Sequence, residues 1–238
     1  VLVDDLVIMN WDNEYQSSMF ALDAATGATV WQSPRDEPTT WATPLIIQRG
    51  GKKQIVTNGT NAIAGYDLRS GKRLCASAGT TLNAIPCPVE FGENVICMAG
   101  YRGNRAVSLK IGAAGEPQLN WELDKGTPYV PSPLLVENRL YFTQSNKAIL
   151  HCLNAETGSY FYPPQRLQAL ENLYGSPVAA NGHVYLADRS GNTLVFRDAE
   201  EFEVLATNRL DDQFDASPVP IGNKLLLRGK QHLYCIQE

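Results

Sequence analysis

A short phrase that recurs at a nearly fixed interval most constrains what this 238-residue chain can fold into. In each copy a small residue precedes a proline, and an apolar run, a turn and a second apolar run follow. Successive prolines of the phrase are 44, 45, 44 and 41 residues apart. A period of this length is typical of an array of similar units, each burying its apolar face against the next. The five copies begin at Thr43-Pro44, Cys87-Pro88, Ser132-Pro133, Ser176-Pro177 and Ser217-Pro218.

Each unit contains the signals of four short strands. The first strand follows the repeated proline, which is tolerated at the first residue of a strand but not within the hydrogen-bonded ladder. Turn signals recur about every ten residues, and helical periodicity is almost absent. This pattern is typical of a β-sandwich or a β-propeller, so we expect a single all-β domain over residues 1–238. Its repeat units, which are blades if the domain is a propeller, are 1–40, 41–84, 85–129, 130–173, 174–214 and an incomplete unit at 215–238.

The turn between the third and fourth strands carries the most specific residues of the repeat. In the first unit it reads Leu22-Asp23-Ala24-Ala25-Thr26-Gly27, and Trp31 follows in the fourth strand. A carboxylate at Asp23 can cap the turn, and Gly27 permits a positive φ, so the chain can reverse tightly. Trp31 supplies a large apolar surface at the outer edge of the blade.

This turn, its weaker copies and the small-residue–Pro starts resemble the pyrroloquinoline quinone-like (PQQ-like) β-propeller repeats. Such repeats occur in quinoprotein dehydrogenases and in the outer-membrane assembly lipoprotein family, and the resemblance covers essentially the whole chain. It implies that the tryptophan and the turn glycine dock neighbouring blades. It also implies a ring of about seven or eight blades, of which about six are visible here. The docking residues implied are Asp23, Gly27, Trp31, Asp67, Gly71, Trp121 and Gly158.

Two sets of loops are expected to meet at one mouth of the propeller channel, which is the default ligand site. They are the loops before each first strand and those between the second and third strands. Flat aromatic rings and planar guanidinium groups in these loops suit sugars, quinones or peptide segments. In the alternative interpretation, the aromatic rings pack between blade ends and the arginines pair with Asp12, Asp188 or Asp215. The predicted binding residues are Trp11, Trp41, Tyr101, Arg102, Tyr129, Tyr174, Arg189 and Arg228.

Charge and hydropathy argue against a nucleic-acid partner and against a transmembrane helix. The formal net charge is −5, and no basic run is longer than the pair Lys52-Lys53. Phosphate contacts need a concentrated basic face, so we expect no nucleic-acid partner. No stretch approaches the length of apolar sequence that a transmembrane helix needs. Because the chain opens on Val1 in mid-pattern, we expect a mature or truncated segment that carries no export signal of its own.

The reactive residue types form no catalytic or metal-binding pattern. The five cysteines have no C-x-x-C spacing, which argues against a zinc site or a disulfide framework. Cys152 and Cys235 align with Ala21, a place for a small buried side chain. The three histidines have no setting of a catalytic triad. The acidic run 211–215 lacks the glycine and distal glutamate of a calcium loop, so we expect a solvated turn.

These observations lead to three hypotheses of function. The first is a non-catalytic binding or scaffold module for a protein or polymer partner, without cofactor or metal. The resemblance places it in the periplasm or elsewhere outside the cytoplasm. The second is a quinoprotein oxidoreductase that uses PQQ with calcium, although the adjacent cysteine pair common in those enzymes is missing. The third is a carbohydrate-binding propeller, with a polysaccharide as partner. No catalytic residue is predicted.

Overall fold

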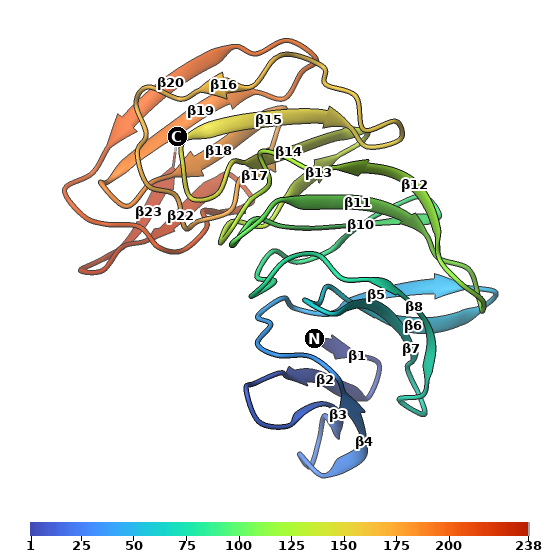
Figure 1. The fold of residues 1–238 in the computed structure, drawn as a ribbon. Coiled ribbons are helices and arrows are strands. Elements are labelled where there is room, and N and C mark those ends of the chain that lie inside the picture. The colour runs from blue at the N-terminus through green and yellow to red at the C-terminus, as the bar shows by residue number, and fades with distance from the viewer. Residues whose placement is uncertain (238) are drawn as a thin grey trace. The chain divides into compact units, whose positions relative to one another are not determined.

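The computed structural model describes residues 1–237, which contain strands and turns but no helix. Their 23 strands form six separate antiparallel sheets, each made of consecutive strands (Figure 1). Five sheets have four strands, and the last has three within the described residues. The prediction of an all-β propeller built from four-stranded blades is therefore confirmed, and each sheet lies within one expected blade range.

The chain divides into two compact units, residues 1–125 and 126–238. The first unit contains three sheets. Their strands are β1 (Leu2–Val3), β2 (Leu6–Trp11), β3 (Ser17–Asp23) and β4 (Thr29–Arg35); β5 (Leu45–Arg49), β6 (Lys52–Thr57), β7 (Ala62–Asp67) and β8 (Arg73–Ala78); and β9 (Val89–Phe91), β10 (Asn94–Ala99), β11 (Arg105–Lys110) and β12 (Gln118–Leu123).

The second unit contains the other three sheets. Their strands are β13 (Leu134–Val136), β14 (Arg139–Thr143), β15 (Ile149–Asn154) and β16 (Gln165–Arg166); β17 (Val178–Ala180), β18 (His183–Ala187), β19 (Asn192–Arg197) and β20 (Val204–Arg209); and β21 (Val219–Ile221), β22 (Lys224–Arg228) and β23 (Leu233–Gln237).

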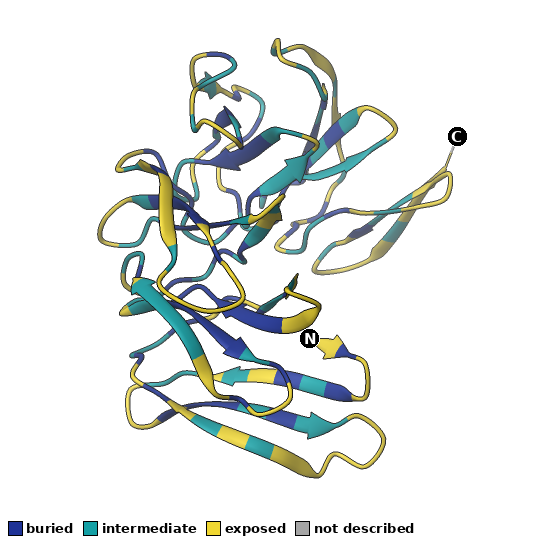
Figure 2. Ribbon diagram, turned by 90° about the vertical axis from the view of Figure 1, so that its right-hand side faces the viewer, coloured by how far each residue is buried: buried dark blue, intermediate teal, exposed yellow. Residues whose placement is uncertain are grey.

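The core of each unit lies between neighbouring sheets. Figure 2 shows buried residues concentrated in the middle strands and exposed residues in the fourth strands and turns. Strand β10 is an example, because residues 95–99 are all buried. A strand covered on both faces has no polar face to present to water, so it reads as a continuous apolar run. Side chains of the first and second sheets, such as Ile8 and Ile55, share one apolar cluster.

The turn residues act as the sequence indicates. The Asp23 carboxylate accepts hydrogen bonds from the N–H groups of Ala25 and Thr26, at 3.1 and 2.8 Å. Asp67 caps the equivalent turn of the second sheet through Ser70 N–H, at 2.8 Å. In the fourth sheet Asn154 takes this place. The glycines that follow, Gly27, Gly71 and Gly158, have φ values of 73°, 68° and 73°.

Trp31 connects the first sheet to the second. Its indole Nε1 donates a hydrogen bond of 3.1 Å to the carbonyl oxygen of Leu68. Its ring lies directly over Gly71, where an added Cβ would be 2.5 Å from Trp31 Cε3. The close approach requires glycine on the receiving turn. In the third sheet Trp121 is buried on β12.

The small residue before each repeated proline has a role that the sequence analysis missed. The N–H group of Ser132 donates to Ser176 Oγ at 2.9 Å, and the N–H group of Ser176 donates to Ser217 Oγ at 2.8 Å. In the first unit the N–H group of Thr43 approaches Cys87 Sγ at 3.3 Å. Within each unit, consecutive copies of the phrase are thus joined, because Cys87, Ser176 and Ser217 each accept a hydrogen bond from the copy before them.

One expectation about burial is wrong. Cys152 is buried, as its alignment with Ala21 predicts, but Cys235 in the same place of the last sheet is exposed. Neighbouring residues of β23 are exposed as well, among them Leu233 at 70%. The position of a residue in the repeat determines the face of the sheet on which its side chain lies. Whether the side chain is buried depends on what covers that face, which differs between Cys152 and Cys235.

Candidate functional site

The first unit contains a hollow of about 470 Å³ at the end of β2. It is lined by residues 8–13, by residues 40–44 that lead into β5, and by Val1. Trp11 and Trp41 both line it, although most of each side chain is exposed, at 59% and 67%. Two of the predicted binding residues, 30 positions apart in the sequence, are therefore at one site.

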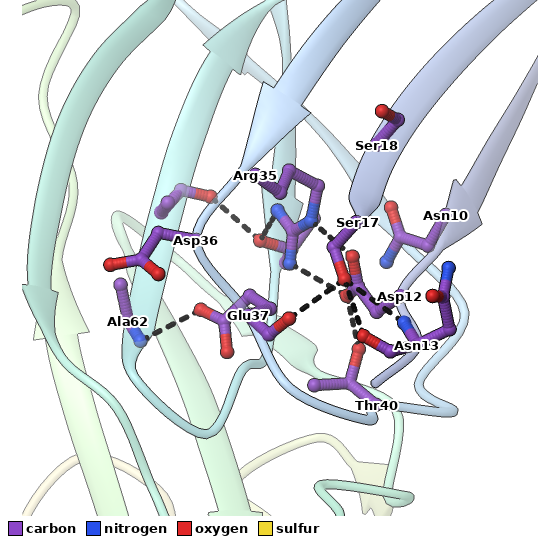
Figure 3. A network of polar contacts seen from close by, with 12 residues as sticks. Asn10, Asp12, Asn13, Ser17, Ser18, Arg35, Asp36, Glu37, Thr40 and Ala62 are labelled. Carbon is purple, nitrogen blue, oxygen red and sulfur yellow. Dashed lines mark hydrogen bonds and ion pairs between the residues drawn. The ribbon is translucent and has the colours of Figure 1, made fainter. Parts of the chain in front are cut away.

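A buried ion pair supports the wall of the hollow (Figure 3). Arg35, at the end of β4, donates two hydrogen bonds to the carboxylate of Asp12, at 2.8 and 3.0 Å. Their side chains are 1% and 0% exposed. Another nitrogen of Arg35 donates to two residues of the second sheet, Thr57 Oγ1 at 3.0 Å and Tyr66 OH at 2.8 Å. Burial acts to lower the pKa of the Arg35 guanidinium group, but the hydrogen bond to Asp12 and the negative charges nearby together raise it.

The segment that carries Trp41 is fixed on both sides. Thr40 Oγ1 donates to the carboxylate of Asp12, and Ser17 Oγ donates to the carbonyl oxygen of Glu37 at 2.7 Å. The Glu37 carboxylate accepts the N–H group of Ala62 at 2.9 Å, as Figure 3 shows. Burial raises the pKa of Glu37, although its backbone hydrogen bonds act in the opposite direction. These contacts fix the position of the segment that lines the hollow.

The other predicted residues of the first unit are elsewhere. Tyr101 and Arg102 lie in the turn between β10 and β11, and neither lines the hollow. The guanidinium carbon of Arg102 is 5.4 Å from the centre of the Tyr101 ring. Arg102 is exposed and has a positive φ of 52°. The two residues therefore form a local cation–π pair at a turn.

The remaining predicted residues belong to the second unit. Arg189 lies over the Tyr174 ring, with its guanidinium carbon 4.2 Å from the ring centre, and pairs with Asp215 at 2.5 Å. This is the arrangement that the alternative interpretation expects for an arginine. Tyr129 is half-buried, and its N–H group donates to Ser145 O at 3.3 Å. Arg228 is exposed at the end of β22. A binding role for these residues stays a prediction.

Two further carboxylates, in loops of the second unit, are buried and accept hydrogen bonds from backbone N–H groups. Asp188 accepts the N–H groups of Ser190 and Asn192, at 2.9 and 2.8 Å. Asp212 accepts Gln213 N–H at 2.7 Å and His232 N–H at 3.1 Å. The expectation of a solvated turn is wrong for Asp212, whose side chain is 0% exposed. Burial acts to raise the pKa of Asp212, but the backbone N–H donors together lower it.

The loop carboxylates do not suit the calcium site of the quinoprotein hypothesis. A calcium ion needs six to eight oxygen ligands, usually including free carboxylates. Asp12 is held by Arg35 and Thr40, while Asp188 and Asp212 accept backbone N–H groups. Among residues 1–237, no group of three or more His, Cys, Asp or Glu side chains is placed to share a metal ion. The part of the chain that the structure describes also has no helix able to cross a membrane.

Comparison with known proteins identifies the family. The family model described as outer membrane protein assembly factor BamB (PQQ_2) matches residues 1–161. The chain belongs to this family. The predicted resemblance to PQQ-like propeller repeats is thereby confirmed. A comparison with curated proteins gave no match.

Solved structures agree on the fold. BamB from Moraxella catarrhalis matches with a TM-score of 0.55 and 16% identity, over 97% of this chain and 78% of that one. The computationally designed Ika8 protein matches with a TM-score of 0.71 and 11% identity, over 100% of this chain and 70% of that one. At such low identity these likenesses show the propeller fold alone.

Proposed function

We propose that this protein is a non-catalytic binding module that engages a protein partner outside the cytoplasm through the hollow beside β2. The observation that carries the proposal is the pair of largely exposed tryptophans, Trp11 and Trp41, at one hollow. Exposed aromatic side chains at a concave site are typical of the residues that dominate protein interfaces. The description of the family as an outer membrane protein assembly factor supports a protein partner and a place in the cell envelope.

The rigidity of the site also supports a binding role. Association costs less free energy when the binding groups are already ordered. The ion pair of Asp12 and Arg35 and the contacts of Glu37 hold the segment that carries Trp41 before any partner arrives. The chemistry of the hollow requires no cofactor, and cofactor-free action is part of the proposal.

Site-specific photo-crosslinking tests the proposal. Trp41 is replaced by p-benzoylphenylalanine, and the chain is exported to the periplasm of a Gram-negative bacterium. We expect one protein species to be crosslinked at position 41 on illumination. Trp11→Ala should reduce its yield at least several-fold, because it removes the second aromatic contact. Mass spectrometry of the crosslinked band identifies the partner.

The matched control carries the same photo-reactive residue at Val204. This residue of β20 is 48% exposed and lies outside the hollow. An equal yield of the same species at positions 41 and 204, or no crosslinked protein at position 41, would contradict the proposal. Crosslinking to polysaccharide alone would do so too, and would favour the carbohydrate-binding hypothesis instead.

A further inference from the structure

The chain contains two Asn-Gly pairs, Asn58-Gly59 and Asn181-Gly182, and the structure places them in different surroundings. An asparagine that precedes glycine readily loses its side-chain amide nitrogen, because glycine has no side chain to hinder attack by its own main-chain nitrogen. The reaction still requires that the side-chain amide can turn toward that nitrogen. The local structure therefore decides which of the two pairs reacts.

The pair Asn58-Gly59 is fixed in the interior of the first unit. Asn58 is 0% exposed, and Gly59 is buried beside it. The Asn58 amide donates to Pro86 O at 3.0 Å and to Met98 O at 2.9 Å, and its Oδ1 accepts the hydroxyl of Thr80 at 3.0 Å. Every polar atom of this side chain is therefore engaged, and the amide cannot turn toward the main chain unless the second and third sheets separate.

The pair Asn181-Gly182 forms the two-residue loop between β17 and β18. Ala180 and His183 are paired on either side of it, and φ is 51° at Asn181 and 74° at Gly182. Positive φ at both positions is typical of the tight hairpin turn that favours Asn-Gly. Both residues are exposed, and an added Cβ at Gly182 would meet nothing within 4 Å.

The Asn181 side chain is also free to move. No residue among those that the structure describes, 1–237, forms a hydrogen bond with it. An exposed turn with few contacts opens locally at a small cost in free energy. The amide of Asn181 can therefore reach the geometry of attack while the rest of the sheet stays folded.

We propose that Asn181 is a site of spontaneous covalent modification by deamidation, and that Asn58 is protected from it. The main-chain nitrogen of Gly182 attacks the side-chain carbonyl carbon of Asn181 and loses its proton to the solvent. The new C–N bond closes a succinimide ring, and the side-chain nitrogen leaves as ammonia. Water then opens the ring at either carbonyl group, which gives aspartate or isoaspartate. Nothing is oxidised or reduced, and the inference does not depend on the proposed function.

The modification affects a contact between the fourth and fifth sheets. The carbonyl oxygen of Gly182 accepts the N–H group of Asp198 at 2.9 Å. The Asp198 carboxylate in turn accepts hydrogen bonds from Arg139 and Tyr141 of the fourth sheet. Isoaspartate adds a carbon to the main chain and so displaces the Gly182 carbonyl, whereas aspartate leaves the main chain unchanged. Isoaspartate at this turn therefore weakens the support of Asp198.

Peptide mapping by mass spectrometry tests the inference, with both asparagines followed in the same sample. The folded chain is kept in a warm, mildly alkaline buffer and sampled over time. We expect a gain of about one mass unit at Asn181, with isoaspartate among the products. Asn58 should react about tenfold more slowly or not at all, because its reaction requires a costly local opening. In urea both should react at similar rates, since each precedes a glycine.

Variants at position 181 complete the test. Asn181→Gln should abolish the modification at this turn, because its longer side chain does not form the succinimide. Equal rates at Asn58 and Asn181 in the folded chain would overturn the inference. An unreactive Asn181 in the folded chain, under conditions where both asparagines react in urea, would overturn it too.

The effect on the contact between the sheets is measured separately. The aged wild type should unfold at a lower urea concentration than fresh Asn181→Asp, which carries the new charge without the extra main-chain carbon. Aged Asn181→Gln is the control for other damage and should unfold as its fresh sample does. Equal midpoints for the aged wild type and Asn181→Asp would overturn the proposed effect on Asp198.

Discussion

Single residues at the ends of strands provide the polar contacts between neighbouring sheets. The Asp198 carboxylate is an example in the second unit, where it accepts hydrogen bonds from Arg139 at 2.7 and 3.0 Å and from Tyr141 OH at 2.7 Å. Burial acts to raise the pKa of Asp198, but the hydrogen bonds from Arg139 and Tyr141 outweigh it. The net pKa of Asp198 is therefore lowered.

We predict that Asp198→Asn lowers the free energy of unfolding by about 2 kcal/mol near neutral pH, because Arg139 loses its buried charged partner and keeps only the exposed Glu137. A carboxylate with a lowered pKa stabilises the fold above its unfolded pKa of about 3.9 and loses that contribution as pH falls through its folded pKa. The difference in unfolding free energy between variant and wild type should therefore shrink below about pH 4. Urea unfolding at several pH values measures this difference.

Glu203→Gln serves as the control for this prediction. Glu203 pairs with Arg197 at the surface, where the two side chains are 54% and 51% exposed. Exposed pairs of this kind contribute little to stability, so the control should unfold nearly as the wild type does. A loss in Asp198→Asn that stayed constant from neutral pH to pH 3 would show that the carboxylate charge is not the cause.

At the scale of elements, the contact of Trp31 with Gly71 joins β4 of one sheet to the turn after β7 in the next. The two turn glycines, Gly27 and Gly71, have nearly the same backbone conformation, with φ of 73° and 68°. They differ in surroundings. An added Cβ meets nothing within 4 Å at Gly27, but at Gly71 it would be 2.5 Å from the Trp31 ring.

This pair allows a controlled test of sheet docking. Gly27→Ala should cost about 1 kcal/mol of unfolding free energy, the strain of a left-handed backbone at alanine. Gly71→Ala causes the same backbone strain and also displaces Trp31. It should therefore lower the unfolding free energy by about 1–3 kcal/mol more than Gly27→Ala does. Chemical denaturation of both variants gives the difference. Equal losses would show that the contact of Trp31 with the turn adds nothing to stability.

At the scale of the whole molecule, the prediction of a single domain spanning residues 1–238 leads to an unfolding experiment. The described contacts form two compact units, 1–125 and 126–238. In repeat arrays each unit is stabilised by its neighbours, and cooperativity depends on the strength of the interfaces. Gly71→Ala alters only the first unit, whereas Asp198→Asn alters only the second.

A single domain predicts one calorimetric transition that both variants shift to lower temperature. We expect this result for the full chain. Two resolved transitions, one lowered by Gly71→Ala and the other by Asp198→Asn, would contradict the single-domain prediction and show that the two units unfold independently.

The sequence by itself determined the blades and their turns. Strand positions follow from apolar runs bounded by turn residues, and the caps of Asp23 and Asp67 bind N–H groups two or three residues away. Such contacts are local, so composition and spacing predict them. Trp11 and Trp41 were predicted to lie near each other, because the loop after a second strand and the loop before a first strand meet at the same end of the sheets, and both line the hollow.

Only the tertiary structure decided which groups meet across sheets. Arg35 reaches Tyr66 across 31 residues and Arg139 reaches Asp198 across 59, and the sequence contains no sign of either pairing. The hydrogen bonds that join Ser132, Ser176 and Ser217 were missed for the same reason. A repeat specifies what each strand presents, but burial and partnership depend on the side chains that the neighbouring sheet brings opposite.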